Sequence, residues 1–125
     1  MSDVLKSETR RNRSLMKRFA ASFTAGDVDA VIACLAPQFE WHLPDGTVCK
    51  GRQDVRSALE QRLNAPSAPE FTNIAFRYHG DTVIQTYDVA ITGPGKTKRR
   101  TRGLDVYRIS KGLIARKDAY WKSFE

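Results

Sequence analysis

Residues 102–122 read RGLDVYRISKGLIARKDAYWK. The stretch consists of two segments rich in aromatic and β-branched residues, separated by Ser-Lys-Gly, a typical turn sequence. This pattern predicts a long antiparallel β-hairpin. Segments of the same character precede it, separated by Gly-Asp and by Gly-Pro-Gly-Lys turn signals. The C-terminal half is therefore predicted to be a meander of strands at 71–79, 82–92, 99–110 and 113–124.

The N-terminal half has the pattern of helices. A first helix is predicted from apolar residues that recur on one side, with Arg and Lys opposite: Leu15, Met16, Phe19, Ala20 and Phe23. Gly26 is predicted to end this helix as a C-terminal cap. A second helix is predicted from Val28 to about Leu35, with Pro37 ending it, and a third from Gly51 to about Asn64.

Between the second and third helices, residues 39–43 (FEWHL) alternate large apolar with polar side chains, which predicts a strand. Pro-Asp-Gly at 44–46 predicts a turn, which a short strand at 47–50 follows. Because helices come first and strands last, an α+β fold is predicted, with three helices packed on one face of a strongly curved, mostly antiparallel sheet.

Length and composition indicate a single domain covering residues 1–125, large enough to bury a core without disulfides or metals. No apolar run approaches the roughly 20 residues that span a bilayer, and the N-terminus lacks the apolar stretch of a signal peptide. A cytoplasmic location and no membrane partner are therefore predicted. Cys34 and Cys49 form no CxxC motif, and neither histidine has a carboxylate at ligand spacing, so no metal site is predicted.

The net charge of +7 arises largely from basic clusters. One cluster follows the Gly-Pro-Gly turn at 96–102 (KTKRRTR), and the other lies in the first predicted helix: Arg10, Arg11, Arg13, Lys17 and Arg18. Clustered cations can neutralise phosphates. However, neither cluster has interleaved aromatic residues or a recognisable helix-turn-helix or zinc-finger pattern. Both are interpreted as solvated faces, and no nucleic-acid partner is predicted.

The predicted order of elements carries several motifs of one family: AGDVDAV at 25–31, W-x-x-P-D-G at 41–46, G-R-x-x-V-R at 51–56 and D-V-Y-R-I-x-x-G-x-I at 105–114. With these motifs the chain resembles the NTF2-like superfamily over nearly its whole length. This is the cone-shaped fold of ketosteroid isomerases and SnoaL-type polyketide cyclases. The resemblance implies a pocket between the sheet and the helices. It leaves the activity open, because the fold hosts isomerases, cyclases, hydrolases and non-catalytic association domains.

Ketosteroid isomerases use an aspartate base, a tyrosine and a protonated aspartic acid. In this resemblance the base position falls at Leu43 and the tyrosine at Phe19, and only the acid is kept, as Asp105. Without a base no proton leaves a steroid, so ketosteroid isomerase activity is not predicted. The carboxylate of SnoaL-type cyclases falls at Ala119, although a one-residue slip would place Asp118 there.

The candidate catalytic residues are Asp105, His42 and Lys117. Period-two geometry places Asp105 on one face of its strand with Gly103 and Tyr107, and the resemblance turns that face inward. Asp105 is expected to act as an acid or base or as a ligand anchor, and the alternative is a structural ion pair. His42 could be a general base or hydrogen-bond donor, but alternation with Trp41 aims it outward.

The ligand pocket is predicted to be lined by apolar and aromatic residues: Phe19, Phe23, Trp41, Leu43, Tyr107 and Trp121. The same residues could simply fill the core. Two functions therefore stay open. The first, which the resemblance implies, is an isomerase-, cyclase- or hydratase-type protein that uses no cofactor and binds or transforms a small hydrophobic cyclic or carbonyl-bearing molecule. The second is a non-catalytic association domain that forms a homodimer through the outer sheet face, where Leu104 and Val106 lie.

The turn of the C-terminal hairpin determines which side chain faces Asp105. A two-residue loop at Lys111-Gly112 would pair Asp105 with Asp118, and a three-residue loop with Gly112 in a G1 bulge would pair it with Lys117. Lysine is a poor first residue for the type I′ turn of the shorter loop, so the longer loop is predicted. Lys117 is then expected to keep Asp105 ionised. The predicted orientation is inward for Lys117 and Trp121 and outward for Asp118 and Tyr120.

Overall fold

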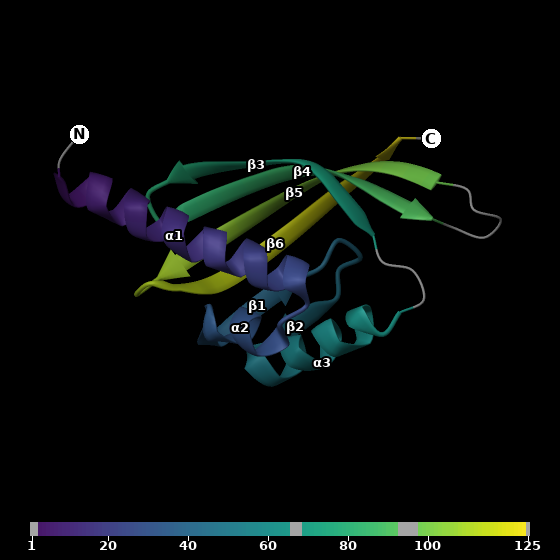
Figure 1. The fold of residues 1–125 in the computed structure, drawn as a ribbon, viewed down its shortest axis with the longest axis horizontal. Helices are drawn as coiled ribbons and strands as arrows, with labels where there is room; N and C mark the ends of the chain where they lie inside the picture. The colour runs from purple at the N-terminus through teal and green to yellow at the C-terminus, as the bar shows by residue number, and fades with distance from the viewer. Residues whose placement is uncertain (1–2, 66–68, 93–97, 125) are drawn as a thin grey trace.

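The structure is a computed structural model that describes residues 3–65, 69–92 and 98–124. Its elements follow the predicted order (Figure 1), and the Gly-Pro-Gly-Lys turn at 93–96 lies outside the described residues. The elements are α1 (Asp3–Ala25), α2 (Val28–Ala33), β1 (Leu35–His42), β2 (Val48–Lys50), α3 (Gly51–Leu63), β3 (Glu70–His79), β4 (Thr82–Thr92), β5 (Lys98–Ser110) and β6 (Leu113–Phe124). None of the helices in this part of the chain combines the length and apolarity needed to cross a membrane.

The described strands form one curved, unclosed sheet in the order β2-β1-β6-β5-β4-β3. Strands β3 to β6 pair antiparallel in sequence order, which confirms the predicted meander, whereas β1 pairs with β6 in parallel. Figure 1 shows α1 lying along the meander, with α2 and α3 beside β1 and β2. The predicted α+β arrangement of helices on a curved sheet is confirmed.

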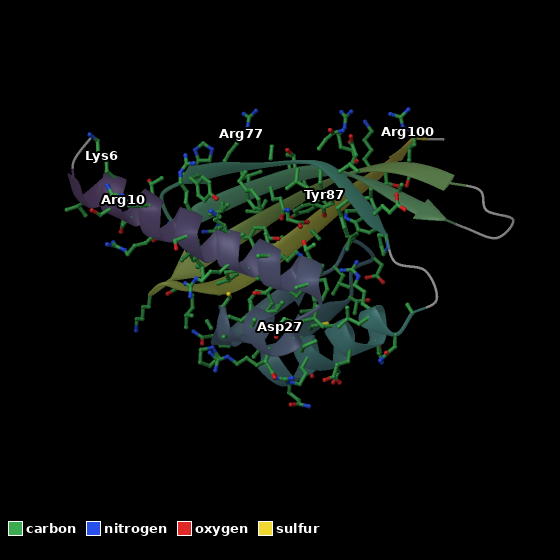
Figure 2. All side chains as sticks on the ribbon, in the orientation of Figure 1. Lys6, Arg10, Asp27, Arg77, Tyr87 and Arg100 are labelled. Atoms are coloured by element: carbon green, nitrogen blue, oxygen red, sulfur yellow. The ribbon has the colours of Figure 1, made fainter. Side chains whose placement is uncertain are left out.

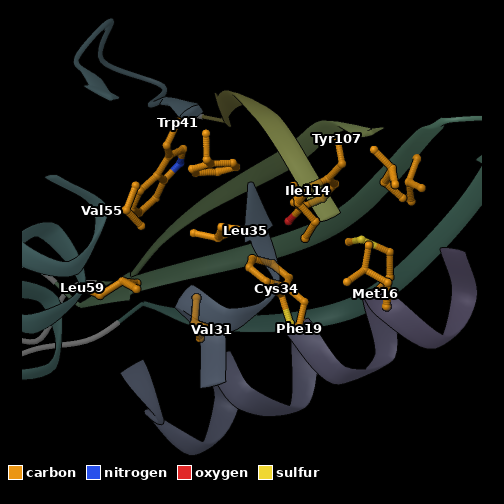
Figure 3. Packing of buried hydrophobic residues seen from close by; sticks show 14 residues of the cluster. Met16, Phe19, Val31, Cys34, Leu35, Trp41, Val55, Leu59, Tyr107 and Ile114 are labelled. Atoms are coloured by element: carbon orange, nitrogen blue, oxygen red, sulfur yellow. The ribbon is translucent and has the colours of Figure 1, made fainter. Parts of the chain in front are cut away.

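The core lies between the helices and the concave face of the sheet (Figure 3). Leu15, Met16 and Phe19 come from the predicted apolar side of α1 and are buried. Burial of each such side chain stabilises the fold by about 1.5–3 kcal/mol. Asn12 lies on the same side of α1, and its Nδ2 donates to the carbonyl oxygen of Gly80 at 2.9 Å. This bond joins α1 to the β3–β4 turn.

The basic cluster of α1 is exposed to solvent, as expected of a solvated face. Figure 2 shows Arg10 near the N-terminal end of the helix. The guanidinium of Arg13 lies 4.7 Å from the ring centroid of Tyr78 on β3, so part of the cluster is used to pack α1 against the sheet.

The predicted end of the second helix was wrong. The helix stops at Ala33, before Pro37, and strand β1 begins at Leu35. The reason is a long-range pairing: Leu35 is opposite Ile114 of β6, and the amide of Ile114 donates to the carbonyl oxygen of Cys34 at 2.9 Å. Pro37 lies inside β1, where the pairing with β6 is irregular, so its missing N–H is tolerated.

The predicted hairpin register was also wrong. The loop consists of two residues, Lys111 and Gly112, which both have positive φ (52° and 76°), and Ser110 is opposite Leu113. A bulge then adds Ala115 on β6, so Ile109 is opposite Ile114 but Arg108 is opposite Arg116. The shift leaves Asp105 opposite neither Lys117 nor Asp118. It lies opposite Ala119, and Tyr107 is opposite Lys117.

Candidate functional site

A cavity of about 430 Å³ lies on the concave side of the sheet. Residues from α1, β1, α3 and the meander line it. The structure places all the predicted wall residues on it: Phe19, Phe23, Trp41, Leu43, Tyr107 and Trp121. Asp105 and Lys117 line it as well. The aromatic residues were expected either to fill the core or to line a pocket. The structure leaves an open space beside them.

Three rows of paired residues cross the sheet beneath the cavity. The first joins Val83, Tyr107, Lys117 and Trp41, the second Gln85, Asp105 and Ala119, and the third Tyr87, Gly103 and Trp121. Because side chains alternate between faces, all members of these rows lie on one side of the sheet. Charged and hydroxyl groups from β4, β5 and β6 therefore come together in the middle row and its neighbours.

Asp105 is 3 % exposed and accepts hydrogen bonds from tyrosine. The hydroxyl of Tyr87 donates to Oδ1 at 2.7 Å, and Nε1 of Trp121 donates to the Tyr87 hydroxyl at 2.9 Å. The hydroxyl of Tyr107 donates to Oε1 of Gln85 at 2.8 Å and lies 3.4 Å from Oδ2 of Asp105. Figure 2 marks the position of Tyr87 on β4. These two consecutive hydrogen bonds, from Trp121 to Tyr87 and from Tyr87 to Asp105, fix the orientation of the carboxylate.

Gly103 makes room for the tyrosine in these hydrogen bonds. A Cβ atom at this position would overlap the ring of Tyr87, which lies directly across from it on β4. The ring of Phe71 packs against the same tyrosine edge-on, with centroids 5.2 Å apart. The absence of a side chain at Gly103 therefore allows Tyr87 to lie flat over β5 and reach Asp105.

Lys117 is the cation beside Asp105. Its Nζ lies 3.6 Å from Oδ2 of Asp105, and its side chain is 11 % exposed. The same nitrogen is surrounded by the rings of Phe19, Phe23, Trp41 and Tyr107, with centroids at 5.0–5.9 Å. The predicted charge pair thus forms although the predicted register does not, because Lys117 reaches Asp105 diagonally from the neighbouring row.

Burial shifts the titration of the groups around the carboxylate. It lowers the pKa of Lys117; Asp105 opposes this effect and Arg62 adds to it. Burial also raises the pKa of Tyr87, and Asp105 raises it further. The pKa of Tyr107 is raised for the same two reasons. Both tyrosines therefore remain hydroxyl donors at neutral pH.

Arg62 closes one side of the cavity from α3. Its guanidinium lies 5.8 Å from the ring centroid of Phe23 and 5.7 Å from that of Trp41. Burial lowers the pKa of this arginine, and nearby Tyr87 and Asp105 oppose the shift. Arg62 adds a second cation to the lining, which an anionic or carbonyl oxygen could contact.

A family model described as a SnoaL-like domain matches residues 16–117. The chain belongs to the SnoaL-like domain family. The matched range includes α1 from Met16 onward, α3 and the sheet as far as Lys117. It therefore contains most of the cavity wall and both members of the charge pair. A search of curated protein sequences finds no match.

Solved structures of similar shape support the NTF2-like fold of this SnoaL-like domain. An NTF2-like protein from Burkholderia xenovorans is 15% identical, with a TM-score of 0.79 and 90% of each chain covered. A candidate polyketide cyclase from Xanthomonas campestris is 22% identical, with a TM-score of 0.77 and coverage of 90% and 91%. The epoxide hydrolase/cyclase-like enzyme SalBIII of salinomycin pyran ring formation is 19% identical, with a TM-score of 0.71 and 92% of each chain covered.

The structure does not bring His42 of this SnoaL-like domain to the cavity. Its Nε2 lies 3.0 Å from Oε1 of Glu40, on the other side of β1 from Trp41, and His42 is not among the cavity-lining residues. Asp118 also lies away from the cavity and is held by the guanidinium of Arg116 at 2.8 and 3.1 Å. The candidate acid–base groups at the cavity are thus Asp105 and Lys117. The described residues contain no cluster of three or more His, Cys, Asp or Glu that could hold a metal.

Sequence reasoning missed several residues of the SnoaL-like site: Tyr87, Gln85, Arg62 and Phe71. For Tyr87 and Gln85 a signal existed, because they lie at a spacing of two residues from the apolar Val83 and Val89 and so share their face of β4. A period-two analysis of residues 82–92 would have placed them on the inner face.

Proposed function

We propose that this SnoaL-like domain binds and transforms a small hydrophobic molecule that carries a carbonyl group or ring, with Asp105 as the acid–base group or ligand anchor. The observation that carries the proposal is a buried carboxylate on the wall of a cavity of about 430 Å³ whose lining is largely aromatic and aliphatic. Ligand sites commonly enclose about 300–1,000 Å³ and hold a few placed polar groups on apolar walls. The cavity has both properties.

The groups around Asp105 suit the role of a proton acceptor. Lys117 supplies an opposite charge at 3.6 Å, and Tyr87 donates a hydrogen bond at 2.7 Å. These two contacts hold the carboxyl group in place at the wall of the cavity. In the proposed reaction the carboxylate of Asp105 removes a proton next to a ligand carbonyl, and the cation of Arg62, which also lines the cavity, stabilises the developing oxyanion.

The relatives are consistent with chemistry of this kind. One similar structure is that of a candidate polyketide cyclase, and another belongs to an epoxide hydrolase/cyclase-like enzyme. The domain differs at the positions of the ketosteroid isomerase base and tyrosine, where it has Leu43 and Phe19, so we do not propose steroid isomerisation.

Thermal-shift measurements with bicyclic ketones such as tetralone test the proposal. A ligand at one hundred times its Kd raises the unfolding free energy by about 2.7 kcal/mol, so a clear rise in Tm is expected. Ala119→Phe, which fills the cavity next to Asp105, should abolish the rise, whereas Ala75→Phe at an exposed position on β3 should retain it. No rise with any apolar ring ketone would count against the proposal.

A second candidate function is homodimer formation through the outer face of the sheet. Leu104 and Tyr120 are directly opposite each other on β5 and β6 and are 36% and 59% exposed. Val106 and Ile84 are paired beside them on the same face. A second copy of the chain that packs against this face would cover these apolar side chains. A dimer of this kind is compatible with a ligand in the cavity, because the cavity opens on the opposite face.

A further inference from the structure

Lys117 differs from the other lysines whose side chains are described. It is buried and lines the cavity, whereas the remaining five are exposed: Lys6, Lys17, Lys50, Lys111 and Lys122. We propose that Lys117 is a nucleophile whose amine forms an imine with a ligand aldehyde or ketone. This inference rests on the proposed function, since it requires a carbonyl compound in the cavity.

The position of the amine suits attack on a carbonyl held in the cavity. Nζ of Lys117 is enclosed by aromatic rings, the nearest being Trp41, with a centroid 5.0 Å away. These rings remove water from the amine and form a flat apolar surface against which an aromatic or cyclic carbonyl compound can lie. A ligand carbonyl beside Asp105 would be within reach of Nζ, because the two side chains are 3.6 Å apart.

The charges around Lys117 favour a reactive amine. The titratable groups that face it are Asp105 and Tyr107 from β5, Tyr87 from β4 and Arg62 from α3. Burial and the charge of Arg62 lower the pKa of Lys117, and Asp105 only partly offsets them. A larger fraction of this amine than of an exposed lysine is then neutral near physiological pH, and the neutral amine is the nucleophile.

Asp105 can move each proton that imine formation requires. Its carboxylate first takes a proton from the ammonium of Lys117. The free amine adds to the carbonyl carbon, and a C–N bond forms as the C=O π bond breaks. The Asp105 carboxyl gives its proton to the alkoxide oxygen and takes one from the nitrogen, which leaves a neutral carbinolamine. It then donates that proton to the hydroxyl, which leaves as water, and the nitrogen lone pair forms the C=N bond of the iminium ion. Asp105 is again ionised, and one water has been released for each imine.

This role differs from that of an electrostatic partner, which needs only a positive charge. Lys117→Arg keeps the charge beside Asp105 but cannot form an imine under these conditions. An imine also activates the carbon next to the former carbonyl, because the iminium nitrogen accepts electrons when a proton is removed. Lys117 and Asp105 would then act together on one substrate.

Reductive trapping with naphthaldehyde and cyanoborohydride tests the proposal on the wild-type chain. Hydride reduces an iminium ion to a stable secondary amine, so one naphthylmethyl group per chain is expected by mass spectrometry. Peptide mapping should find most of the label on Lys117. Lys117→Arg should lose this label, Lys122→Arg should keep it, and in urea the label should spread over all lysines.

Naphthylmethanol, which has the same ring but no carbonyl, separates this inference from the proposed function. If it raises Tm while naphthaldehyde labels only exposed lysines, the cavity binds ring compounds but Lys117 is not a nucleophile, and the inference fails. If neither compound raises Tm and Lys117 stays unlabelled, both proposals fail. Preferential labelling of Lys117 supports both, and because it is mapped on the wild-type chain, it does not depend on any variant folding.

Discussion

Asp105 is held in place by groups that are themselves buried. Trp121 donates to Tyr87 and Tyr87 donates to Asp105, so the carboxylate has a fixed orientation toward the cavity and Lys117. A buried charge without such partners would cost several kcal/mol. The same bonds also keep Tyr87 in one position, and its hydroxyl can serve as a probe of the site.

Tyr87 and Tyr107 should lose their hydroxyl protons at a higher pH than an exposed tyrosine. The pKa values of Tyr87 and Tyr107 are raised above the usual 10.0, chiefly by burial. Between pH 10 and the folded-state values the unfolded chain loses these protons while the native chain keeps them. The stability they contribute is therefore complete below pH 10 and is lost as the pH rises above it.

Absorbance titration of tyrosinate measures this effect directly. The native chain should show a late phase that Tyr87→Phe and Tyr107→Phe each reduce and that Tyr120→Phe, at an exposed position, leaves unchanged. A single phase near pH 10 that includes every tyrosine would contradict the buried geometry.

Strand β5 shows what could be predicted from the sequence and what could not. Local alternation places Gly103, Asp105 and Tyr107 on one face, the family resemblance predicted that this face points inward, and all three are buried. The predicted register between β5 and β6 was wrong, because the register depends on Lys111 adopting a positive φ and on the bulge at Ala115. Neither is indicated by a local pattern.

The start of β1 was missed for a related reason. Leu35 belongs to a strand because it pairs with Ile114, far away in the sequence, and no signal near Leu35 indicates that contact. The Lys117–Asp105 pair was nevertheless expected correctly, because a long lysine side chain reaches across one row of the sheet and tolerates the error in register.

The close approach of β5 and Tyr87 predicts the cost of a side chain at Gly103. Gly103→Ala forces the ring of Tyr87 to move and should destabilise the domain by about 1–3 kcal/mol, as overpacking typically does. Tyr87→Val removes the obstacle. In the Tyr87→Val background, Gly103→Ala should change the unfolding free energy little. The difference between its effects in the two backgrounds, measured by chemical denaturation, gives the energy of the contact. Equal costs in both backgrounds would show that the ring is not the obstacle.

At the scale of the whole molecule, the two faces of the sheet have different properties. The concave face carries the cavity and the buried charge pair, whereas the outer face exposes Leu104 and Tyr120. Because these surfaces point in opposite directions, the proposed association and the proposed ligand binding can be tested separately.

Light scattering tests the association surface. We expect a dimer at micromolar concentration, with a total buried area of about 1,200–2,000 Å² as in stable interfaces. Leu104→Glu should shift the mass to that of a monomer and leave the thermal stabilisation by ring ketones in place. A wild-type chain that scatters as a monomer would contradict homodimer formation.

We propose above all that Asp105 transfers protons to and from a ligand held in the cavity. Exchange of the protons next to the carbonyl of tetralone with deuterium from heavy water, followed by NMR, measures this transfer directly. The wild-type domain should accelerate the exchange over buffer, and Asp105→Asn should lose the acceleration while tetralone still raises its Tm. Exchange at the buffer rate with the wild-type domain, or at an unchanged rate with Asp105→Asn, would contradict the claim.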